Sequence, residues 1–474
     1  MKLAECAPET WAASLAVVDG ELRWTWGELD RETDRVVGLL QQHGVAAGDR
    51  VALLADRSAL TIAALRGVLR AGAIAVPMEP HGPLLRQVAI LEDAAPKVVL
   101  VGKRAARRSK AVQRRVTAPF VPLDGASAAG RSAPVAGSDP ALILYTSGST
   151  GRPKGVVLAH EAVGCFARWA ADTLELTAKD RVAHLSPLTF DLCTLELFAA
   201  AEVGAAVVVI PPVATMFPAT LAEVLTAQHC SVVYTVPSVW MRLQSAALAP
   251  LSKGPLRHIV YAGEPFPPAA LSKLMADLPG RVVHNFFGPT ETNVCAAHRV
   301  LSPPLNAVPI GFPPDYYRIS VRPDGELWVS GLGVMQGYWR RPELNAEVFV
   351  EEGGHLWLKT GDRVRRDPDG TLHALGRRDT MLKLHGFRVQ PEEVEQALSA
   401  HPGIHAARVG LDAEGVLMAE VEVASGDVPA DLSRHLARRL PRHMVPARVD
   451  VVDALPRTPR GKLDRAKPLE AAVR

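Results

Sequence analysis

The sequence predicts an α/β protein: a large N-terminal domain of layered α/β subdomains and a β-rich subdomain, followed by a small mobile α+β C-terminal domain. Three observations predict this class. Apolar runs of strand length alternate with helical patterns through the first part of the chain, an alternation that builds α/β layers. Farther on, Pro-Asp-Gly turns indicate short hairpins. The C-terminal part combines short strands with two helices.

The N-terminal elements follow from this alternation. Buried strands are expected at 50–54, 97–101, 205–210, 231–235, 258–261 and 282–285, and helices at 59–69 and 219–228. The stretch 118–140 is dense in Ala, Ser, Gly and Pro, which predicts a long surface connection. A basic run at 103–115 has no interleaved aromatic residues, so we interpret it as a surface loop rather than a nucleic-acid patch.

The pattern changes in the second half of the chain. After Asp315, the turns at 323–325 and 368–370 predict hairpins in a β-rich subdomain. From about residue 378 we expect a short strand pair, a helix at 391–399, strands at 406–410 and 417–423, and a helix at 429–439. This predicts a large core at 1–377 and a small domain at 378–474.

Composition limits the class of protein. At 474 residues, 48% hydrophobic and 22% charged, the chain is expected to form two or three globular domains. The net charge of +3 does not favour nucleic acid as a partner. Five scattered cysteines without paired spacing fit a reduced compartment, and no apolar run is long enough to span a bilayer. We therefore expect a cytoplasmic protein without a membrane partner.

A glycine-rich and hydroxyl-rich loop follows the apolar run 141–144. Its glycines let backbone N–H groups point inward, and its hydroxyls and lysine add donors and positive charge, so it predicts a polyphosphate site. The spacing does not match a Walker A loop, because Gly155 stands where that loop has its hydroxyl residue. A flexible Ser/Gly linker is the alternative. The predicted phosphate-binding residues are Thr146, Ser147, Gly148, Ser149, Thr150, Gly151 and Lys154.

This loop closely resembles the core motif of the adenylate-forming superfamily, which includes adenylation domains of nonribosomal peptide synthetases, acyl-CoA ligases and luciferases. The resemblance covers the whole chain, with further motifs in the family's order at 69–72, 76–77, 190–191, 285–291, 325–327, 337–338, 360–362, 376–379, 440–446 and 461–465. It implies an enzyme that uses ATP to convert a carboxylic acid to an acyl-adenylate with release of pyrophosphate.

The resemblance also implies the contacts to phosphate and metal. Negative charge must be screened while the carboxylate attacks the α-phosphorus. Glu291 is expected to hold Mg2+ between phosphate oxygens, and Thr290 to donate to the α-phosphate. By itself, Glu291 would more commonly be a carboxylate at a helix N-terminus.

Adenine and ribose contacts are implied by three other motifs. Phe287 is expected against the adenine face, with Asn285 at its exocyclic amine. Asp362 would accept from the ribose hydroxyls, and Arg377 would brace the nucleotide. Taken singly, these residues are more often a core phenylalanine, a turn aspartate and a solvated arginine. The backbone of a further segment is expected on the other side of the adenine: Ala262, Gly263 and Glu264.

Lys462 is the predicted catalytic residue of the C-terminal domain. In the family it bridges the substrate carboxylate and the α-phosphate, and a lysine on a mobile domain delivers its charge only on closure. The alternative is a solvated lysine in a basic tail. Asp379 stands where the resemblance places the hinge, and an ordinary turn aspartate is its alternative.

The acid to be activated is predicted from the pocket residues. Asp191 matches the position at which amino-acid-activating members pair an aspartate with the substrate ammonium, whereas a helix N-cap is the alternative. The positions that align with the pocket lining are uncharged, which predicts a small or medium apolar side chain: Leu192, Leu195, Thr235, Val260, Ala262, Phe286, Val294 and Cys295.

Five of these residues resemble the lining of stand-alone prolyl adenylating enzymes that load a carrier protein, which makes L-proline the best prediction. Thr235, Val260 and Phe286 depart from that lining, so a related cyclic or branched amino acid remains open. No carrier segment follows Lys462, so we expect transfer to the phosphopantetheine thiol of a separate carrier protein. Met381 and Gln390 depart from the family pattern of the hairpin expected to face the carrier. An acyl- or aryl-CoA ligase is the alternative function.

Overall fold

The computed structural model describes residues 3–148, 152–246, 248–384, 386–412, 414–423, 426–457, 463 and 469. Contacts within the chain divide it into two compact units. Unit 1 comprises Met1–Pro80, Ala94–Leu144 and Gly155–Arg378. Unit 2 comprises Asp379–Arg474 together with two short earlier segments, His81–Asp93 and Tyr145–Lys154.

An eight-stranded sheet in unit 1 has the order β14-β13-β12-β11-β9-β10-β1-β2. Its inner strands run parallel, whereas β2 and β14 are antiparallel edges. The carboxyl ends of the parallel strands therefore meet at one edge, where open α/β sheets bind ligands. The strands are β1 (Leu15–Asp19), β2 (Leu22–Thr25), β9 (Arg181–His184), β10 (Ala206–Val209), β11 (Val232–Thr235), β12 (His258–Tyr261), β13 (Val282–Phe287) and β14 (Ala296–Val300).

A seven-stranded sheet has the order β17-β8-β7-β4-β3-β5-β6. The strands expected at 50–54 and 97–101 form its parallel centre. The expected surface connection at 118–140 differs from the prediction, because it contains an edge strand that pairs with β5. The strands are β3 (Arg50–Leu54), β4 (Ile74–Met78), β5 (Val98–Val101), β6 (Phe120–Pro122), β7 (Pro140–Thr146), β8 (Lys154–Ala159) and β17 (Gly337–Tyr338).

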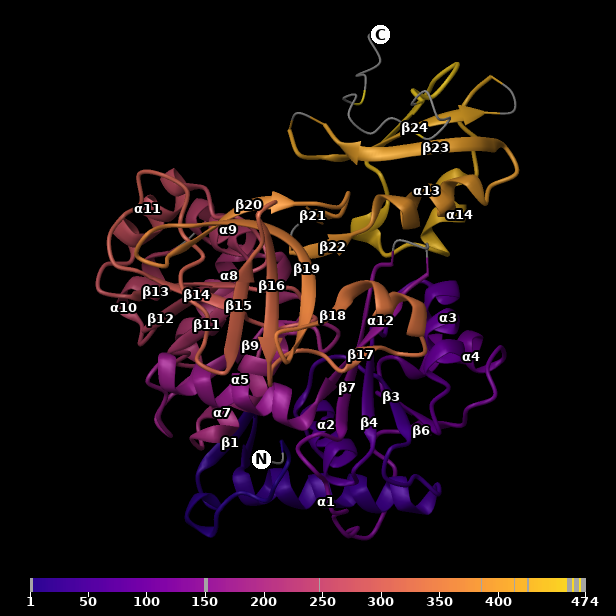
Figure 1. The fold of residues 1–474 in the computed structure, drawn as a ribbon. Coiled ribbons are helices and arrows are strands. Elements are labelled where there is room, and N and C mark those ends of the chain that lie inside the picture. The colour runs from indigo at the N-terminus through magenta and orange to yellow at the C-terminus, as the bar shows by residue number, and fades with distance from the viewer. Residues whose placement is uncertain are drawn as a thin grey trace. The chain divides into compact units, whose positions relative to one another are not determined.

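The β-rich subdomain is an antiparallel sheet in which β15, β16 and β19 lie side by side (Figure 1). The predicted turns at 323–325 and 368–370 connect β15 to β16 and β19 to β20, which confirms both hairpins. Gly325 and Gly370 have φ of 85° and 92°, which glycine adopts without strain. The strands are β15 (Tyr317–Val321), β16 (Glu326–Gly331), β18 (Phe349–Glu352), β19 (His355–Arg366) and β20 (Leu372–Arg377).

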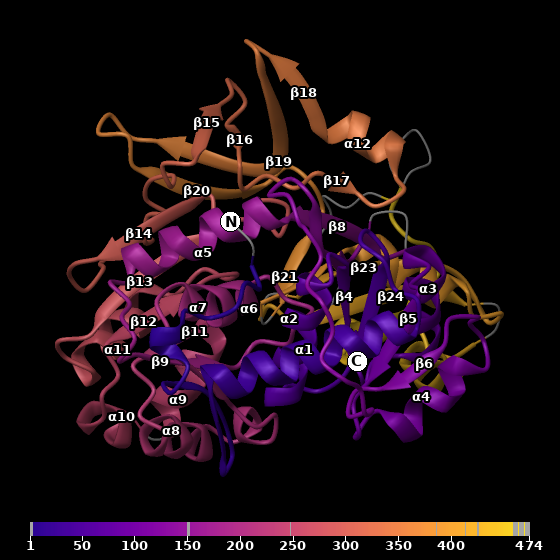
Figure 2. The ribbon, with the colours of Figure 1, turned by 90° about the horizontal axis from the view of Figure 1, so that it is seen from below.

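Helices of unit 1 cover the large sheets. Helix α1 packs along α2 (Figure 2) and begins with a capping box, in which the Thr25 hydroxyl accepts from Glu28 N and the Glu28 carboxylate accepts from Thr25 N. The helices are α1 (Trp26–Gln42), α2 (Ala59–Arg70), α4 (Ala106–Gln113), α5 (His160–Thr173), α6 (Leu192–Thr194), α7 (Ala200–Glu202), α8 (Pro218–Ala227), α9 (Pro237–Ala246), α10 (Ala249–Lys253), α11 (Pro268–Asp277) and α12 (Pro342–Val348).

The basic run at 103–115 corrects one expectation. It is not a loop, because α4 occupies Ala106–Gln113. Ser109 and Val112 are buried, while Arg107 and Arg108 are exposed. The run is therefore one solvated face of an amphipathic helix.

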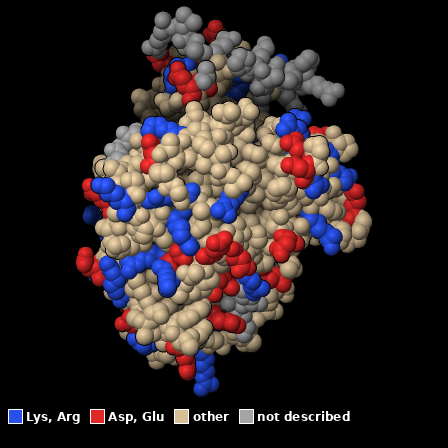
Figure 3. All heavy atoms as spheres, turned by 90° about the vertical axis from the view of Figure 1, so that its left-hand side faces the viewer, with Lys and Arg blue, Asp and Glu red and all other residues tan. Residues whose placement is uncertain are grey.

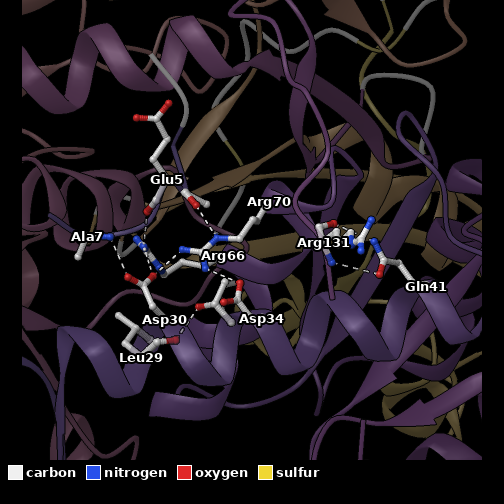
Figure 4. Close-up of polar contacts among 11 residues, drawn as sticks. Glu5, Ala7, Leu29, Asp30, Asp34, Gln41, Arg66, Arg70 and Arg131 are labelled. Atoms are coloured by element: carbon white, nitrogen blue, oxygen red, sulfur yellow. Dashed lines mark hydrogen bonds and ion pairs between the residues drawn. The ribbon is translucent and has the colours of Figure 1, made fainter. Parts of the chain in front are cut away.

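Two buried arginines of α2 tie it to α1 and to the N-terminal segment (Figure 4). Arg70 donates to Asp34 Oδ1 at 2.7 Å, to Asp30 and to the carbonyl of Ala4, and it is 4% exposed. Arg66 donates to Asp30 Oδ1 at 3.2 Å. Since each buried charge has a partner, this network joins three segments without an uncompensated ion.

Unit 2 has its own apolar core, formed by helices and strands that follow Asp379. The helix predicted at 391–399 and the strand predicted at 417–423 are present with those bounds, whereas the last helix is shorter than expected. Its elements are α3 (Leu84–Ala94), β21 (Leu382–Leu384), β22 (Phe387–Val389), α13 (Pro391–Ser399), β23 (Ile404–Leu411), β24 (Leu417–Val423), α14 (Leu432–Ala437) and β25 (Arg448–Val451).

Charge and hydropathy give two further findings. Figure 3 shows Lys and Arg side chains interspersed with Asp and Glu on the face that it draws, with no continuous basic stripe there. None of the helices in the described ranges combines the length and apolar character that a membrane span requires.

Candidate active site

The connection between β13 and β14 is a tight turn that carries Thr290 and Glu291. Cys295 N donates to Phe287 O at 2.8 Å, which closes the connection at its base. Gly288 is required there, since an added Cβ would lie 2.0 Å from Asn293 O. Asn293 itself has a φ of 56°, and its amide donates to Thr194 Oγ1 at 2.7 Å. The turn is therefore fixed both within itself and against α6.

Glu291 is buried in this turn, with only 4% of its surface exposed. Its Oε1 accepts a hydrogen bond from the Tyr338 hydroxyl at 2.7 Å, and its carbonyl accepts from Met335 N at 2.8 Å. The alternative of a helix N-terminal carboxylate is wrong, because the chain passes directly from the turn into β14. A carboxylate whose one oxygen accepts from a phenol still offers oxygen ligands of the kind that a hard cation prefers.

Asp191 immediately precedes α6, yet its side chain does not cap that helix. Instead, the Thr290 hydroxyl donates to the carboxylate, and Glu291 lies close enough to act on it. Burial raises the pKa of the Asp191 carboxyl to about 6, with a further increase from Glu291 and a partial offset from the Thr290 hydrogen bond. Asp191 itself is partly buried. Two neighbouring carboxylates disfavour each other's charge, so a cation between or beside them is stabilised.

Most of the predicted pocket lining lies in one apolar cluster. Thr235, Val260 and Phe286 lie at or near the carboxyl ends of the neighbouring parallel strands β11, β12 and β13. Leu192 is partly buried against this cluster, and the other members are fully buried: Leu195, Val260, Ala262, Phe286 and Val294. Cys295 is the exception, because it packs with Tyr317 and Leu327 in the core of the β-rich subdomain.

Aromatic side chains that the sequence reasoning did not select also contact this cluster. The Trp169 and Phe286 rings are 5.1 Å apart, and the Tyr234 and Phe286 rings are 5.9 Å apart. Trp169 lies on α5, far from every motif in the sequence, so no local pattern could identify it. Tyr338 belongs to the motif at 337–338, and that motif was the available signal for its contact with Glu291.

The adenine-site residues lie at the end of β13 and after β12. Asn285 is buried, and its amide nitrogen donates to Pro309 O at 2.9 Å, so the side-chain oxygen remains as an acceptor. Glu264 turns its carboxylate to Ser238 N at the start of α9, at 3.0 Å. Because this contact engages the Glu264 carboxylate, the adenine contact predicted for segment 262–264 would have to come from its backbone.

Asp362 and Arg377 form a buried pair on adjacent strands. Arg377 donates to Asp362 Oδ1 at 2.9 Å and to Thr360 O at 3.2 Å. Asp362 is 3% exposed, so the alternative of a surface turn aspartate is wrong. Gly361 has a φ of 73° at an irregularity in the pairing of β16 with β19. This bulge re-aims the Asp362 side chain, as bulges beside binding sites do.

The described part of the phosphate loop belongs to unit 2. The Thr146 hydroxyl is buried and has no hydrogen-bond partner among the described residues, which fits a ligand oxygen at this position. The Ser147 hydroxyl instead donates to Arg388 O at 2.9 Å. At Gly148 an added Cβ would lie 2.3 Å from Arg152 O, so the loop needs glycine there. Lys154 is the first residue of β8.

Several predicted residues are not tested by this geometry. Ser149, Thr150, Gly151 and Lys462 lie outside the described residues. Asp379 is exposed in a bend at the start of the C-terminal part of unit 2. Met381 and Gln390, which flank the hairpin of β21 and β22, are buried.

Two family models match the chain over nearly its whole length. Residues 4–339 match the model described as AMP-binding enzyme, and residues 393–462 match the AMP-binding enzyme C-terminal domain. The chain belongs to the AMP-binding enzyme family. The AMP-binding enzymes include the adenylation domains named from the motifs, so the resemblance is confirmed, and with it the use of ATP.

Two relatives of this AMP-binding enzyme are named L-proline–[L-prolyl-carrier protein] ligase. The protein of Pseudomonas fluorescens is 38% identical, and the match covers 95% of this chain and 94% of its own length. The protein of Streptomyces coelicolor is 36% identical, and the match covers 93% of this chain and 90% of its own length. Among solved structures, o-succinylbenzoate CoA synthetase of Bacillus subtilis has a TM-score of 0.85 at 25% identity, covering 96% of this chain and 95% of that one. These likenesses confirm the predicted α/β fold with a separate C-terminal subdomain.

Proposed function

We propose that this AMP-binding enzyme activates L-proline with ATP to prolyl-AMP and pyrophosphate, and then transfers the prolyl group to the phosphopantetheine thiol of a separate carrier protein. The two relatives named L-proline–[L-prolyl-carrier protein] ligase align with this chain over nearly their full length, which supports the proposal. The sequence likeness is independent of the pocket geometry, and both favour the same substrate class.

The Asp191 carboxylate is the observation that carries the amino-acid assignment. It is partly buried next to Leu192, which packs against the apolar cluster, and it accepts from Thr290. Its pKa is raised by the loss of hydration and, further, by Glu291. An isolated carboxylate in such surroundings is destabilised, and an ammonium at hydrogen-bond distance would compensate its charge. The secondary ammonium of proline supplies that charge, whereas its ring requires only apolar contacts.

The pocket residues favour a compact apolar side chain. Leu195, Val260 and Val294 are branched and almost inaccessible, so they leave no charged or long polar partner for a substrate side chain. An apolar pocket separates substrates that differ by one methylene by only about 1–3 kcal/mol. Proline is therefore the best substrate of this proposal, and pipecolate or valine are its nearest competitors.

The nucleotide is proposed to be held by the groups already described. Asp362 would accept from the ribose, the Asn285 side-chain oxygen from the adenine amine, and the backbone of 262–264 would complete the adenine site. Thr290 would donate to the α-phosphate. Lys462, on a C-terminal domain 378–474 that turns at Asp379, would meet the substrate carboxylate and the α-phosphate when the domain closes.

Mg2+ fits the oxygen ligands of this site. Glu291 provides one buried carboxylate, and no cluster of three or more His, Cys, Asp or Glu side chains suited to a metal occurs in the described ranges. Mg2+ typically takes one or two carboxylates together with substrate phosphates and water. We propose that Glu291 holds the ion, which when bound would neutralise phosphate charge.

An acyl- or aryl-CoA ligase is the second candidate, because the fold is shared with o-succinylbenzoate CoA synthetase. Such substrates carry no ammonium and would leave the Asp191 charge uncompensated.

The five cysteines are all free, which supports the proposed cytoplasmic location.

The proposal is tested by ATP–pyrophosphate exchange with each proteinogenic amino acid, pipecolate, acetate and benzoate. Proline is expected to give the highest exchange, and Asp191→Ala is expected to lower it at least about 100-fold, since a buried charge pair contributes several kcal/mol when one partner is removed. The highest response to acetate, benzoate or a charged amino acid would reject the proposal. Coenzyme A in place of the carrier separates the two candidate functions.

A further inference from the structure

A fully buried carboxylate and imidazole lie directly beside the proposed amino-acid pocket. Glu196 is the second residue of the π-helical turn η2 (Leu195–Ala199), and His184 is the last residue of β9. Both residues are 0% exposed, and His184 Nδ1 lies 2.6 Å from Glu196 Oε2. Neither residue belongs to the nucleotide site or to the lining described above.

The Glu196 carboxylate takes all its other described donors from the residues that follow His184. Ser186 donates through its hydroxyl at 2.8 Å and through its backbone N–H at 3.1 Å, both to Oε1. Leu185 N lies 3.3 Å from the same oxygen. A buried charged carboxylate is stabilised only where such donors compensate its lost hydration, so the arrangement is expensive to disturb.

These hydrogen bonds join the two ends of one short stretch of chain. Segment 186–196 begins two residues after the end of β9, and the hydrogen bonds from Ser186 to the Glu196 carboxylate close it into a ring. Asp191, Leu192 and Leu195 all lie inside that ring. Within it, Asp191 O accepts from Thr194 N at 2.9 Å, which makes the enclosed turn short and internally bonded.

The π-helical turn that contains Glu196 affects how the pocket residues before it are oriented. A π turn contains one more residue than an α turn, and such turns occur often at functional sites. Residues before it are rotated relative to an uninterrupted α-helix, so the anchoring of Glu196 fixes which way the preceding side chains face. Glu196 is also close enough to the pocket to act on its ionisable groups. Burial raises the pKa of the Cys193 thiol, and the Glu196 and Asp191 carboxylates both raise it further.

We propose that Glu196, held by His184 and Ser186, is a positioning residue for the amino-acid pocket. It sets the place of Asp191 against the substrate ammonium and of Leu192 and Leu195 against the substrate side chain, without touching the substrate. This inference rests on the proposed function and deepens it, since it names what fixes the specificity of the same site. The nucleotide contacts at Asn285, Asp362 and Glu291 lie outside the ring.

Glu196→Gln tests the proposal, since glutamine keeps the size and one oxygen but loses the charge and an acceptor. In ATP–pyrophosphate exchange we expect the KM for proline to rise at least about tenfold, as expected for loss of a buried charged hydrogen bond. The KM for ATP should stay within about twofold, and the preference for proline over pipecolate should shrink. Ser186→Ala, which removes only the hydroxyl donor, should raise the same KM by a smaller factor.

Glu202→Gln is the matched control. Glu202 is the last residue of α7, in the same helical stretch, but its Oε2 lies 4.0 Å from Arg168 Nε and it takes no part in the ring. It should leave both KM values unchanged. If Glu196→Gln does not fold, Ser186→Ala tests the proposal instead, through a rise in the KM for proline without a rise in the KM for ATP. Unchanged proline KM, or equal rises for proline and ATP, would overturn this inference while leaving the proposed function intact. A wild-type enzyme without amino-acid-dependent exchange would overturn both.

Discussion

At the scale of single residues, the site depends on how burial changes the chemistry of carboxyl groups. Asp191 and Glu291 come from different elements and share Thr290 and its turn as a neighbour. Glu291 accepts a hydrogen bond from the Tyr338 hydroxyl, whereas Asp191 has a raised pKa and precedes Leu192 of the apolar lining. These different surroundings suit Glu291 to bind a metal ion and Asp191 to bind an organic cation.

The raised pKa of Asp191 gives a pH dependence with a definite sign. The amino acid pairs with the ionised carboxylate, so kcat/KM for proline should rise as the pH increases through about 6, the pKa of the free enzyme's carboxyl. Exchange rates measured at low proline between pH 5 and 8 would show this inflection. Asp191→Asn should have low activity throughout that range and no inflection near pH 6.

The same shift predicts a change in stability. A carboxyl group whose pKa is raised on folding contributes stability that is complete below its unfolded pKa and is lost as the pH rises through its folded pKa. Asp191→Asn should therefore raise the Tm of the ligand-free protein at pH 8 more than at pH 4. A Tm difference between variant and wild type that does not depend on pH would contradict the assigned pKa.

Residue identity alone left several interpretations open. The sequence allowed Asp191 to be a helix cap, Glu291 a helix N-terminal carboxylate and Asp362 a surface turn residue. Each of these interpretations depends on where the side chain points and on what covers it. Those facts come from strands and turns distant in sequence, so a local pattern could not decide among them.

At the scale of elements, the turn at 288–293 shows how backbone geometry places a site. Its closure needs a residue without Cβ at Gly288 and a left-handed conformation at Asn293, which asparagine tolerates better than most residues. Thr290 and Glu291, the two side chains of the turn that are proposed to contact phosphate and Mg2+, lie between these two positions. A small change in the turn therefore moves both.

Gly288→Ala should consequently reduce activity more than stability. The new Cβ would meet Asn293 O at 2.0 Å, so the turn must shift, and a displacement of about 1 Å can lower kcat about 100-fold. Exchange kinetics together with thermal unfolding measure the two effects. Gly254→Ala is the control, since its added Cβ would make only ordinary contacts, the nearest at 3.4 Å. Near-normal kcat in Gly288→Ala would show that the turn does not place the catalytic groups.

Element prediction succeeded where the signal was local. Alternating apolar runs located the strands β3, β11 and β12, and Pro-Asp-Gly turns located two hairpins. The basic run at 103–115 was misjudged as a loop because its composition is polar, although Ser109 and Val112 give it a buried side. The last helix is shorter than predicted, since helix ends are set by contacts as well as by propensity.

At the scale of the whole molecule, the proposed reaction needs groups from both parts of the chain. Unit 1 contains the amino-acid pocket, Glu291 and the pair of Asp362 with Arg377. In the proposed reaction, Lys462 of the C-terminal domain 378–474 would reach the reacting atoms when that domain closes. If so, its removal should leave the amino-acid pocket of unit 1 undisturbed.

Lys462→Ala should abolish ATP–pyrophosphate exchange, with a loss of at least about 100-fold in kcat, as for removal of a group that stabilises transition-state charge. The proline concentration that shifts the Tm should stay the same, because the pocket is intact. Lys179→Ala, at an exposed position, is the control and should behave as wild type. Retained exchange in Lys462→Ala would refute the catalytic assignment.

The sequence by itself determined the α/β class, the hairpins and the family, because these depend on local periodicity, turn chemistry and motifs in a fixed order. Tertiary structure alone decided that Asp191 contacts Thr290, that Tyr338 holds Glu291, and that Cys295 packs in another core from Val294. It also brought His184 onto Glu196. The physical reason is that burial and hydrogen bonding between distant segments, rather than residue type, set the charge and direction of each side chain.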